Sequence, residues 1–365
     1  TARQFYTFTR TKYLLDFSNV ERINSFNIDD IEFLGNGRAN GIMLPPLGIA
    51  WGVRDCWFSR PRTRAITSIG RACQGISIDR NQFIASDDDL LVPDRNSIAF
   101  NINANDSKIR NNRCVQFKHF AIFNGSGNLI VGNHFWVLDS DADGDKSAGI
   151  VFTQANAKST VTGNYIDNMS IEMANEHSPN GETRSAGFGK LTISGNIFTA
   201  QLVPDRFTFL RIRPRGNGWV MNGITVTDNT FKMFNGAFLD RIDEYDNSFG
   251  SLNHAETRDV IFTGNSFDRV RQKAESPVTV AHTQNSANAT WTVNLSEFMP
   301  FACEALGVDG IVPQGQIVNS GGSGVFDQPW VNTRVGADAN QVQLRWSTAT
   351  TGTVHLRARC DLAKG

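Results

Sequence analysis

The sequence has few of the residues that cross-link a small fold. Its 365 residues include only five cysteines, none of them paired as CxxC, and the odd number leaves one over. A disulfide framework or a structural zinc site is therefore not expected. One bridge, between Cys303 and Cys360, is left open because both lie in the same terminal region. We expect Cys56 and Cys114 to be buried as small apolar residues.

Long apolar runs, excess charge and helical periodicity are also missing. No run of eighteen apolar residues occurs, so no membrane span is expected. The 35 Lys and Arg nearly balance the 36 Asp and Glu, and no basic excess points to nucleic acid. The six histidines show no metal-ligand spacing. No window of eleven or more residues keeps a 3.6-residue apolar period, which disfavours helices.

What the chain does have is a short sequence repeat. The clearest copy, at residues 261–267, reads IFTGNSF, and related copies stand at 226–231, 193–198, 161–166 and 131–135. With weaker copies included, the asparagine or its equivalent falls 21 to 36 residues apart, at positions 31, 56, 81, 112, 133, 164, 196, 229 and 265. A repeat of this length is typical of a stacked solenoid, in which each unit buries its apolar face against the next.

The repeats predict an all-β fold. Short apolar runs between Gly and Asn favour a right-handed parallel β-helix of about nine coils, with Gly and Asn at the tight corners. Asparagines stacked at one corner can hydrogen-bond along the ladder. At about 4.8 Å a coil, the rod is roughly 40 Å long.

The chain divides into three regions. After Ser276-Pro277 the repeat stops, and the runs at 290–295, 341–346 and 353–359 alternate as half-exposed antiparallel strands. The predicted regions are an N-terminal cap or connector at 1–25, the β-helix at 26–285, and a small antiparallel β-sandwich at 286–365. Insertions at 84–96, 136–148 and 168–190 are expected to project from the rod, where binding sites commonly lie.

An acidic loop is the strongest local signal for a cofactor. Asp139, Asp141, Asp143 and Asp145 stand at every second position around a glycine, like the start of a calcium-binding loop. Position twelve is Ile150, where a bidentate Glu belongs, and no helix is expected beside it. Two alternatives stay open: a bound Ca²⁺ completed from a neighbouring coil, or an exposed loop that binds nothing.

An arginine-rich strand is the second signal. Alternation over 209–215 places Leu210 and Ile212 inside and Arg211 and Arg213 outside, with Trp219 following. We expect a row of outward guanidinium groups suited to carboxylates or sulfates of an acidic glycan. The alternative is a solvated face paired with nearby acids.

Carboxylates that could cleave a glycan complete the candidates. A glycosidase needs two of them across one groove, and the candidates are Glu172, Asp205, Asp240 and Asp243, with Glu244 beside the last. The alternative for each one is a surface charge.

The Gly-Asn repeat, the rod and the antiparallel tail together resemble pectate-lyase-like parallel β-helix proteins, and among them phage tailspikes and related virion surface spikes. The sequence lacks the Gly-His-Gly of polygalacturonases and the Trp-x-Asp-His of pectate lyases. The resemblance to tailspikes implies a trimer that recognises, and often cleaves, bacterial capsular or lipopolysaccharide glycans.

Two functions follow as hypotheses. The first is a receptor-binding spike on a phage-like particle or other extracellular surface, which holds bacterial polysaccharide and joins its particle through a partner at the N-terminus. The alternative is a depolymerase that hydrolyses or eliminates the polymer. A purely structural virion component is a third hypothesis.

Overall fold

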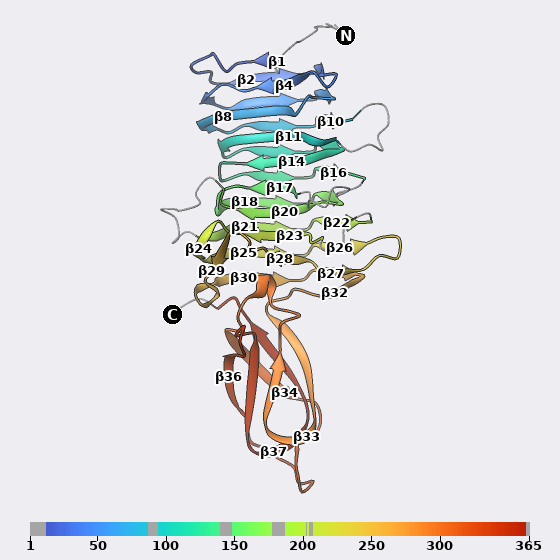
Figure 1. Ribbon diagram of the computed structural model, residues 1–365, viewed down its shortest axis with the longest axis vertical. Helices are drawn as coiled ribbons and strands as arrows, with labels where there is room; N and C mark the ends of the chain where they lie inside the picture. Colours follow the sequence, from blue (N-terminus) through green and yellow to red (C-terminus); the bar gives the residue numbers. More distant parts are fainter. Residues whose placement is uncertain are drawn as a thin grey trace.

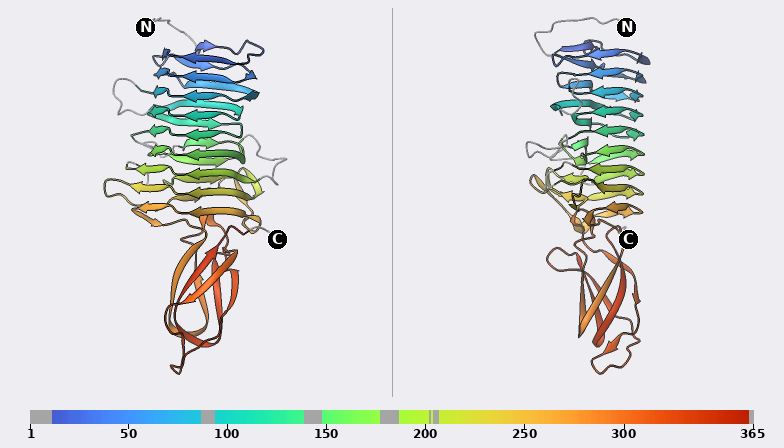
Figure 2. Two further views of the ribbon diagram at one scale, coloured as in Figure 1. Left: turned by 180° about the vertical axis from the view of Figure 1, so that it is seen from behind. Right: turned by 90° about the vertical axis from the view of Figure 1, so that its right-hand side faces the viewer.

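The computed structural model describes residues 12–86, 94–138, 148–176, 187–201, 203 and 207–362. Short strands stack one above another into a rod, and longer strands form a tail at one end (Figure 1). Seen from behind and from the side, the tail continues along the long axis of the rod (Figure 2). The rod is a parallel β-helix, as the sequence predicts, with the right-handed sense usual for parallel β crossovers.

Three parallel sheets build the rod. Sheet A runs in the order β1 (Lys12–Asp16), β4 (Ala39–Met43), β8 (Arg64–Gln74), β11 (Asp94–Asn105), β14 (Phe117–Phe123), β17 (Ala148–Phe152), β20 (Ser170–Ala174), β23 (Leu210–Arg213) and β28 (Asp243–Tyr245), with β5 (Leu47–Ile49) beside β8. Sheet B runs in the order β2 (Phe26–Asp29), β6 (Trp51–Arg54), β9 (Ser77–Asp79), β12 (Lys108–Arg110), β15 (Leu129–Val131), β18 (Asn156–Thr162), β21 (Phe188–Ser194), β25 (Met221–Thr227) and β30 (Arg258–Thr263). Sheet C runs in the order β3 (Glu32–Leu34), β7 (Trp57–Ser59), β10 (Gln82–Ile84), β13 (Arg113–Val115), β16 (His134–Trp136), β19 (Tyr165–Asp167), β22 (Ile197–Ala200), β26 (Thr230–Met233) and β31 (Ser266–Asp268). Over the described residues, sheets B and C thus hold nine strands each, which agrees with the nine predicted coils.

The repeated asparagines line the corner between sheets B and C. Each side chain accepts hydrogen bonds from the coil before it: in the step from Asn133 to Asn164, both the backbone N–H and the side-chain amide of Asn133 donate to Oδ1 of Asn164 at 2.9 Å. The same amide also donates to the carbonyl of Ile109 at 3.0 Å. The side-chain ladder continues unbroken from Asn81 to Asn265. The predicted asparagine ladder is confirmed.

Apolar residues fill the interior of the rod in matching columns. Phe33, Phe58 and Phe83 stack with ring centroids 4.8 and 4.7 Å apart. Cys56 and Cys114 are buried as expected, and burial raises the pKa of both thiols. Because each ring packs on the equivalent ring of the next coil, the core is continuous along the rod.

Four further strands and one short 3₁₀ turn lie beside the lower coils, and a second 3₁₀ turn lies in the tail against the last rung. β24 (Gly216–Trp219) pairs with β29 (Gly250–Leu252), and β27 (Leu239–Arg241) pairs with β32 (Val270–Gln272). The turns are η1 (His254–Glu256) and η2 (Pro300–Ala302). The first pair and η2 border the site described below.

The tail is antiparallel, as predicted. Its five strands are β33 (Val278–Asn294), β34 (Gly307–Pro313), β35 (Val318–Asn319), β36 (Trp330–Val335) and β37 (Gln341–Arg359). Hydrogen bonds join them into one sheet around β37, with β33 along one edge of β37 and the three shorter strands along the other. The two longest strands, β33 and β37, therefore run along the length of the tail.

Both predicted boundaries of the rod shift. The rod already includes β1, which pairs with β4 in sheet A, so the region 1–25 is not wholly a separate cap. The tail begins with β33 at Val278, ahead of the predicted residue 286, because β33 already pairs with β37 at that residue and continues, with two register shifts, to Asn294. Cys303 and Cys360 are buried free thiols, so the bridge left open from the sequence is not formed. No helix in the described residues has the length and apolarity needed to cross a membrane.

Candidate functional site

Some of the predicted site residues lie on the last three rungs of sheet A, namely Glu172, Arg211, Arg213, Asp243 and Glu244. Register pairs Glu172 of β20 with Arg211 of β23, and Arg211 with Glu244 of β28. All three side chains point out of the coil, because their neighbours Leu210 and Ile212 are fully buried inside it. Opposite charges therefore alternate along three stacked strands.

Arg211 does not face solvent, so that part of the sequence-based expectation is wrong. Its side chain is only 1% exposed, with Nη1 2.9 Å from Glu172 Oε2 and Nε 3.1 Å from Glu244 Oε2. The carboxylates on the rungs above and below close over the guanidinium. Alternation correctly predicts that Arg211 leaves the core, but two ion pairs then bury it on the outer face.

Arg213 is the more accessible cation. Its Nε donates to Asp246 at 2.9 Å, and Nη1 lies 3.9 Å from Glu172. Burial alone would lower the pKa of Arg213, but the carboxylates of Glu172 and Asp246 outweigh it and raise that pKa. Burial would likewise raise the pKa of Asp246, yet hydrogen bonds from Ser248 and Arg213 lower it to about 2. The pair is charged across the neutral pH range.

Trp219 is also placed differently from the prediction. Its ring is 1% exposed and packs against Phe188 with centroids 5.7 Å apart, so it offers no surface to a ligand. The indole N–H instead donates to the carbonyl of Arg215 at 2.8 Å. The Asn175 side chain also holds this main chain: it accepts the Arg215 N–H at 2.6 Å and donates to the Arg215 carbonyl at 2.9 Å. Trp219 thus positions Arg215.

Of the remaining carboxylate candidates, Asp243 and Asp240 do not form one site with Glu172. Asp243 is buried, binds Nε of Arg241 at 2.6 Å and accepts the backbone N–H of Phe301. This position fits a role in docking the tail on the rod. Asp240 is exposed on β27, where it pairs with Arg271 of the neighbouring strand β32. These two strands form a separate sheet from β20, β23 and β28, which carry the ladder. Asp205 lies outside the described residues.

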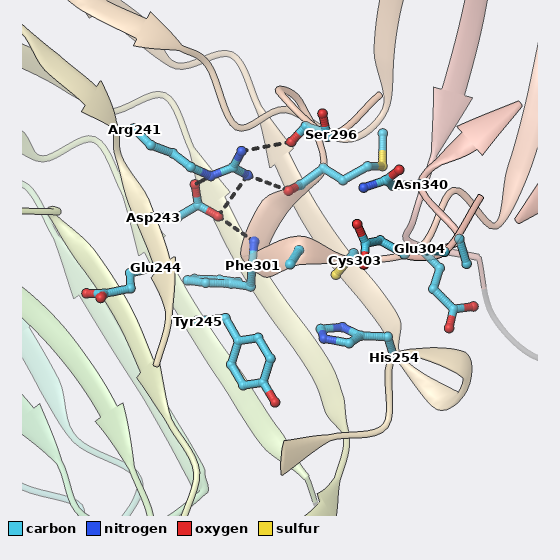
Figure 3. Close-up of a pocket in the computed structure, with 15 residues that line it drawn as sticks. Arg241, Asp243, Glu244, Tyr245, His254, Ser296, Phe301, Cys303, Glu304 and Asn340 are labelled. Carbon is cyan, nitrogen blue, oxygen red and sulfur yellow. Dashed lines mark hydrogen bonds and ion pairs between the residues drawn. The ribbon is translucent and has the colours of Figure 1, made fainter. Parts of the chain in front are cut away.

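A cavity of about 670 Å³ opens where the rod meets the tail. Figure 3 shows Glu244 and Tyr245 from the last rung, His254 beside the Tyr245 ring, and Glu304 from the tail. The two rings lie edge to face, with centroids 5.3 Å apart. Burial lowers the pKa of His254, and the negative charge of Glu304 partly offsets this lowering. Glu244 is the residue shared by this cavity and the charged ladder.

The sequence also predicts a calcium site, in the acidic segment 139–145. Asp139, Asp141, Asp143 and Asp145 all lie outside the described residues. Within the part of the chain that is described, no three His, Cys, Asp or Glu side chains are grouped so as to hold a metal ion. A calcium site in that loop stays a prediction.

Two residues beside the site could not be identified from the sequence pattern, namely Phe249 and Glu304. Phe249 lies next to Arg213 and Arg215, with their guanidinium carbons 5.7 and 4.8 Å from its ring centroid. Glu304 reaches the cavity from the tail. Neither residue belongs to a repeat, and only the fold brings them beside β23 and β28.

No family model matches the sequence, and no curated protein matches it. Among solved structures, the chain is similar to a mutant tailspike protein of E. coli bacteriophage HK620 in complex with a pentasaccharide, with 11% identity and a TM-score of 0.46 over 96% of this chain and 72% of that one. It is also similar to a mutant DFA-IIIase from Arthrobacter chlorophenolicus A6, with 16% identity and a TM-score of 0.43. That match covers 67% of this chain and spans 55% of the DFA-IIIase chain. At these levels the similarity says nothing about what this chain binds.

Proposed function

We propose that this chain is the polysaccharide-binding part of a surface spike, which attaches a phage-like particle to a bacterial capsule or lipopolysaccharide. Three copies would present three such sites to one repeating polymer, and a partner at the N-terminus would join the spike to its particle. On this proposal the protein lies on the outside of a virion or in the extracellular space.

The observation that carries the proposal is a group of partly exposed charges at the last rungs of sheet A, namely Arg213, Arg215 and Glu244, of which Glu244 also lines the junction cavity. A glycan presents hydroxyl groups, and often carboxylates, at regular intervals. Guanidinium groups donate hydrogen bonds to both, and protein carboxylates accept hydrogen bonds from the hydroxyl groups. Strand rungs about 4.8 Å apart hold these groups at a fixed repeat. The rigid rod holds the main chain of these residues in a fixed arrangement, which lowers the entropic cost of binding.

A direct binding measurement tests the proposal. Labelled capsular and lipopolysaccharide fragments are titrated with the full chain and with two single variants, Arg213→Ala and Arg54→Ala. Both arginines pair with an aspartate, at 2.9 and 3.0 Å, but only Arg213 borders the site. We expect the first variant to bind about tenfold more weakly and the second to bind like wild type. Failure of every fragment to bind, or equal loss in both variants, would contradict the proposal.

A depolymerase is the second candidate, favoured by one feature of the ladder. Glu172 and Glu244 lie on the rungs on either side of Arg211, so two carboxylates stand on one face of sheet A, as a glycosidase requires. Both carboxylates contact Arg211. In a hydrolase one carboxyl group would protonate the leaving oxygen while the other activated water.

Product analysis separates the two candidates. New reducing ends on incubation with a bound polysaccharide, lost in Glu244→Gln but kept in the remote variant Glu32→Gln, would identify a hydrolase. Absorbance of unsaturated uronate would instead identify a lyase. Binding with neither product would support the spike that holds its polymer intact.

A further inference from the structure

Phe249 and Arg215 form an exposed pair at the edge of the ladder. The Arg215 guanidinium carbon lies 4.8 Å from the Phe249 ring centroid, and Phe249 is 53% exposed. The Arg213 guanidinium lies 5.7 Å from the same ring. An apolar ring surface and two cations therefore meet at one point of the surface.

The main chain holds this pair in place. The carbonyl of Phe249 accepts the backbone N–H of Gly216, directly after Arg215, at 3.0 Å. Gly250 permits this approach, since a Cβ at that position would lie 2.1 Å from the Gly216 carbonyl oxygen. Asn175 and Trp219 fix the Arg215 backbone by three hydrogen bonds. The arrangement is thus set before any ligand arrives.

The Arg215 side chain is available for exchange. Its Nη2 lies 3.2 Å from Glu176 Oε1, and both side chains are more than a third exposed. Exposed pairs of this kind contribute little to stability, so a ligand carboxylate can take the place of Glu176 at low cost. Arg213, in contrast, is held by the partly buried Asp246.

We infer that Phe249 and Arg215 form a subsite for an acidic sugar of the uronic acid type, which rests on the proposed polysaccharide-binding function. The C–H face of the sugar ring packs on Phe249, and its carboxylate accepts two parallel N–H bonds from the Arg215 guanidinium. A planar guanidinium suits a carboxylate better than an ammonium does, and Arg recognises this geometry in preference to Lys.

The test uses oligogalacturonate of defined length and the same oligomer with its carboxyl groups reduced to neutral galactose. We expect wild type to bind the acidic form at least tenfold more tightly. Phe249→Ala and Arg215→Lys should each lose at least tenfold for the acidic oligomer. Phe238→Ala is the matched control, because Phe238 is 57% exposed and lies 5.4 Å from the guanidinium of Arg271 on another part of the rod. It should bind like wild type.

Each outcome decides the inference. Equal affinity for the acidic and reduced oligomers, tighter binding of dextran sulfate than of oligogalacturonate, or equal losses in Phe249→Ala and Phe238→Ala would overturn it. Binding of neutral capsule or lipopolysaccharide fragments alone would overturn the subsite but leave the proposed function standing. Thermal melts that match wild type confirm that the variants fold.

Discussion

At the scale of single residues, Arg211 shows how far an outward position can differ from an exposed one. We expect Arg211→Ala to lower the free energy of unfolding by about 3 kcal/mol, because it leaves two carboxylates beside an empty site. The exposed Arg54, paired with Asp29, is the control, and its loss should cost under about 1 kcal/mol. Urea titration measures both. A loss for Arg211→Ala no greater than for Arg54→Ala would contradict this prediction.

This contrast also marks the limit of what alternation predicts. The pattern over 209–215 correctly placed Leu210 and Ile212 in the core. It could not show that Glu172 and Glu244, 39 residues before and 33 after Arg211, lie on the neighbouring rungs. Nor could it show that Trp219 turns inward, since that depends on the pairing of β24 with β29. Charge partners in a solenoid are set by register between coils, which local sequence does not encode.

Asp246 supplies a prediction on pH. Its pKa lies near 2 in the folded chain, below its ordinary value of 3.8. A lowered pKa means that the stabilisation is present above about pH 3.8 and is lost as the pH falls toward 2. We expect Asp246→Asn to be about 1 kcal/mol less stable at pH 6, after solvent screening, with the difference vanishing near pH 2. Urea titrations at pH 6, 4 and 2 test this, and a constant difference would contradict it.

At the scale of elements, the asparagine ladder follows directly from the repeat. Its spacing predicts one corner of every coil, and the structure places the asparagines there. The positions were predictable because a buried amide at a corner must be satisfied by the next coil, so the same residue recurs. The junction cavity was not predictable, because its wall comes from the tail, which has no repeat.

Replacing one ladder residue should break bonds on both sides. Asn164→Ala removes the acceptor for two Asn133 donors and the donor to the Ile130 carbonyl. Because these groups are buried, we expect a loss of about 3 kcal/mol in the free energy of unfolding. Asn27→Ala, at an exposed position on β2, should cost under about 0.5 kcal/mol. Denaturant titration of both variants decides, and equal losses would contradict the role of the ladder.

A calcium site at residues 139–145, which lie outside the described residues, stays a prediction. If Asp139, Asp141, Asp143 and Asp145 bind Ca²⁺, millimolar calcium should raise the melting temperature by a few degrees over EDTA, because only the folded chain holds the ion. The double variant Asp141→Asn with Asp143→Asn should lose this response, while Asp268→Asn on β31 should keep it. Identical melts in calcium and EDTA would refute the site.

At the scale of the whole molecule, the tail leaves part of its aromatic surface uncovered. Trp291, Phe301 and Trp346 are buried, but Phe326 and Trp330 are 92% and 75% exposed. Contiguous exposed apolar patches often mark an interface. We expect this surface to be covered by a second copy of the tail, in a closed threefold arrangement around the rod axis.

A parallel homotrimer would have a mass of about 121 kDa, three times the 40.3 kDa of one chain. We expect light scattering to return that mass for wild type, and the double variant Phe326→Ala with Trp330→Ala to shift it toward one chain, because removing two buried rings from an interface costs several kcal/mol in each contact. Phe238→Ala, which removes an exposed ring from the rod instead of the tail, should leave the trimer intact.

Association would also raise avidity for a repeating polymer by orders of magnitude. The double variant should therefore bind polysaccharide much more weakly, while each single site keeps its affinity for a short oligomer. A mass near 40 kDa for wild type, or a trimer that survives the double substitution, would refute this arrangement.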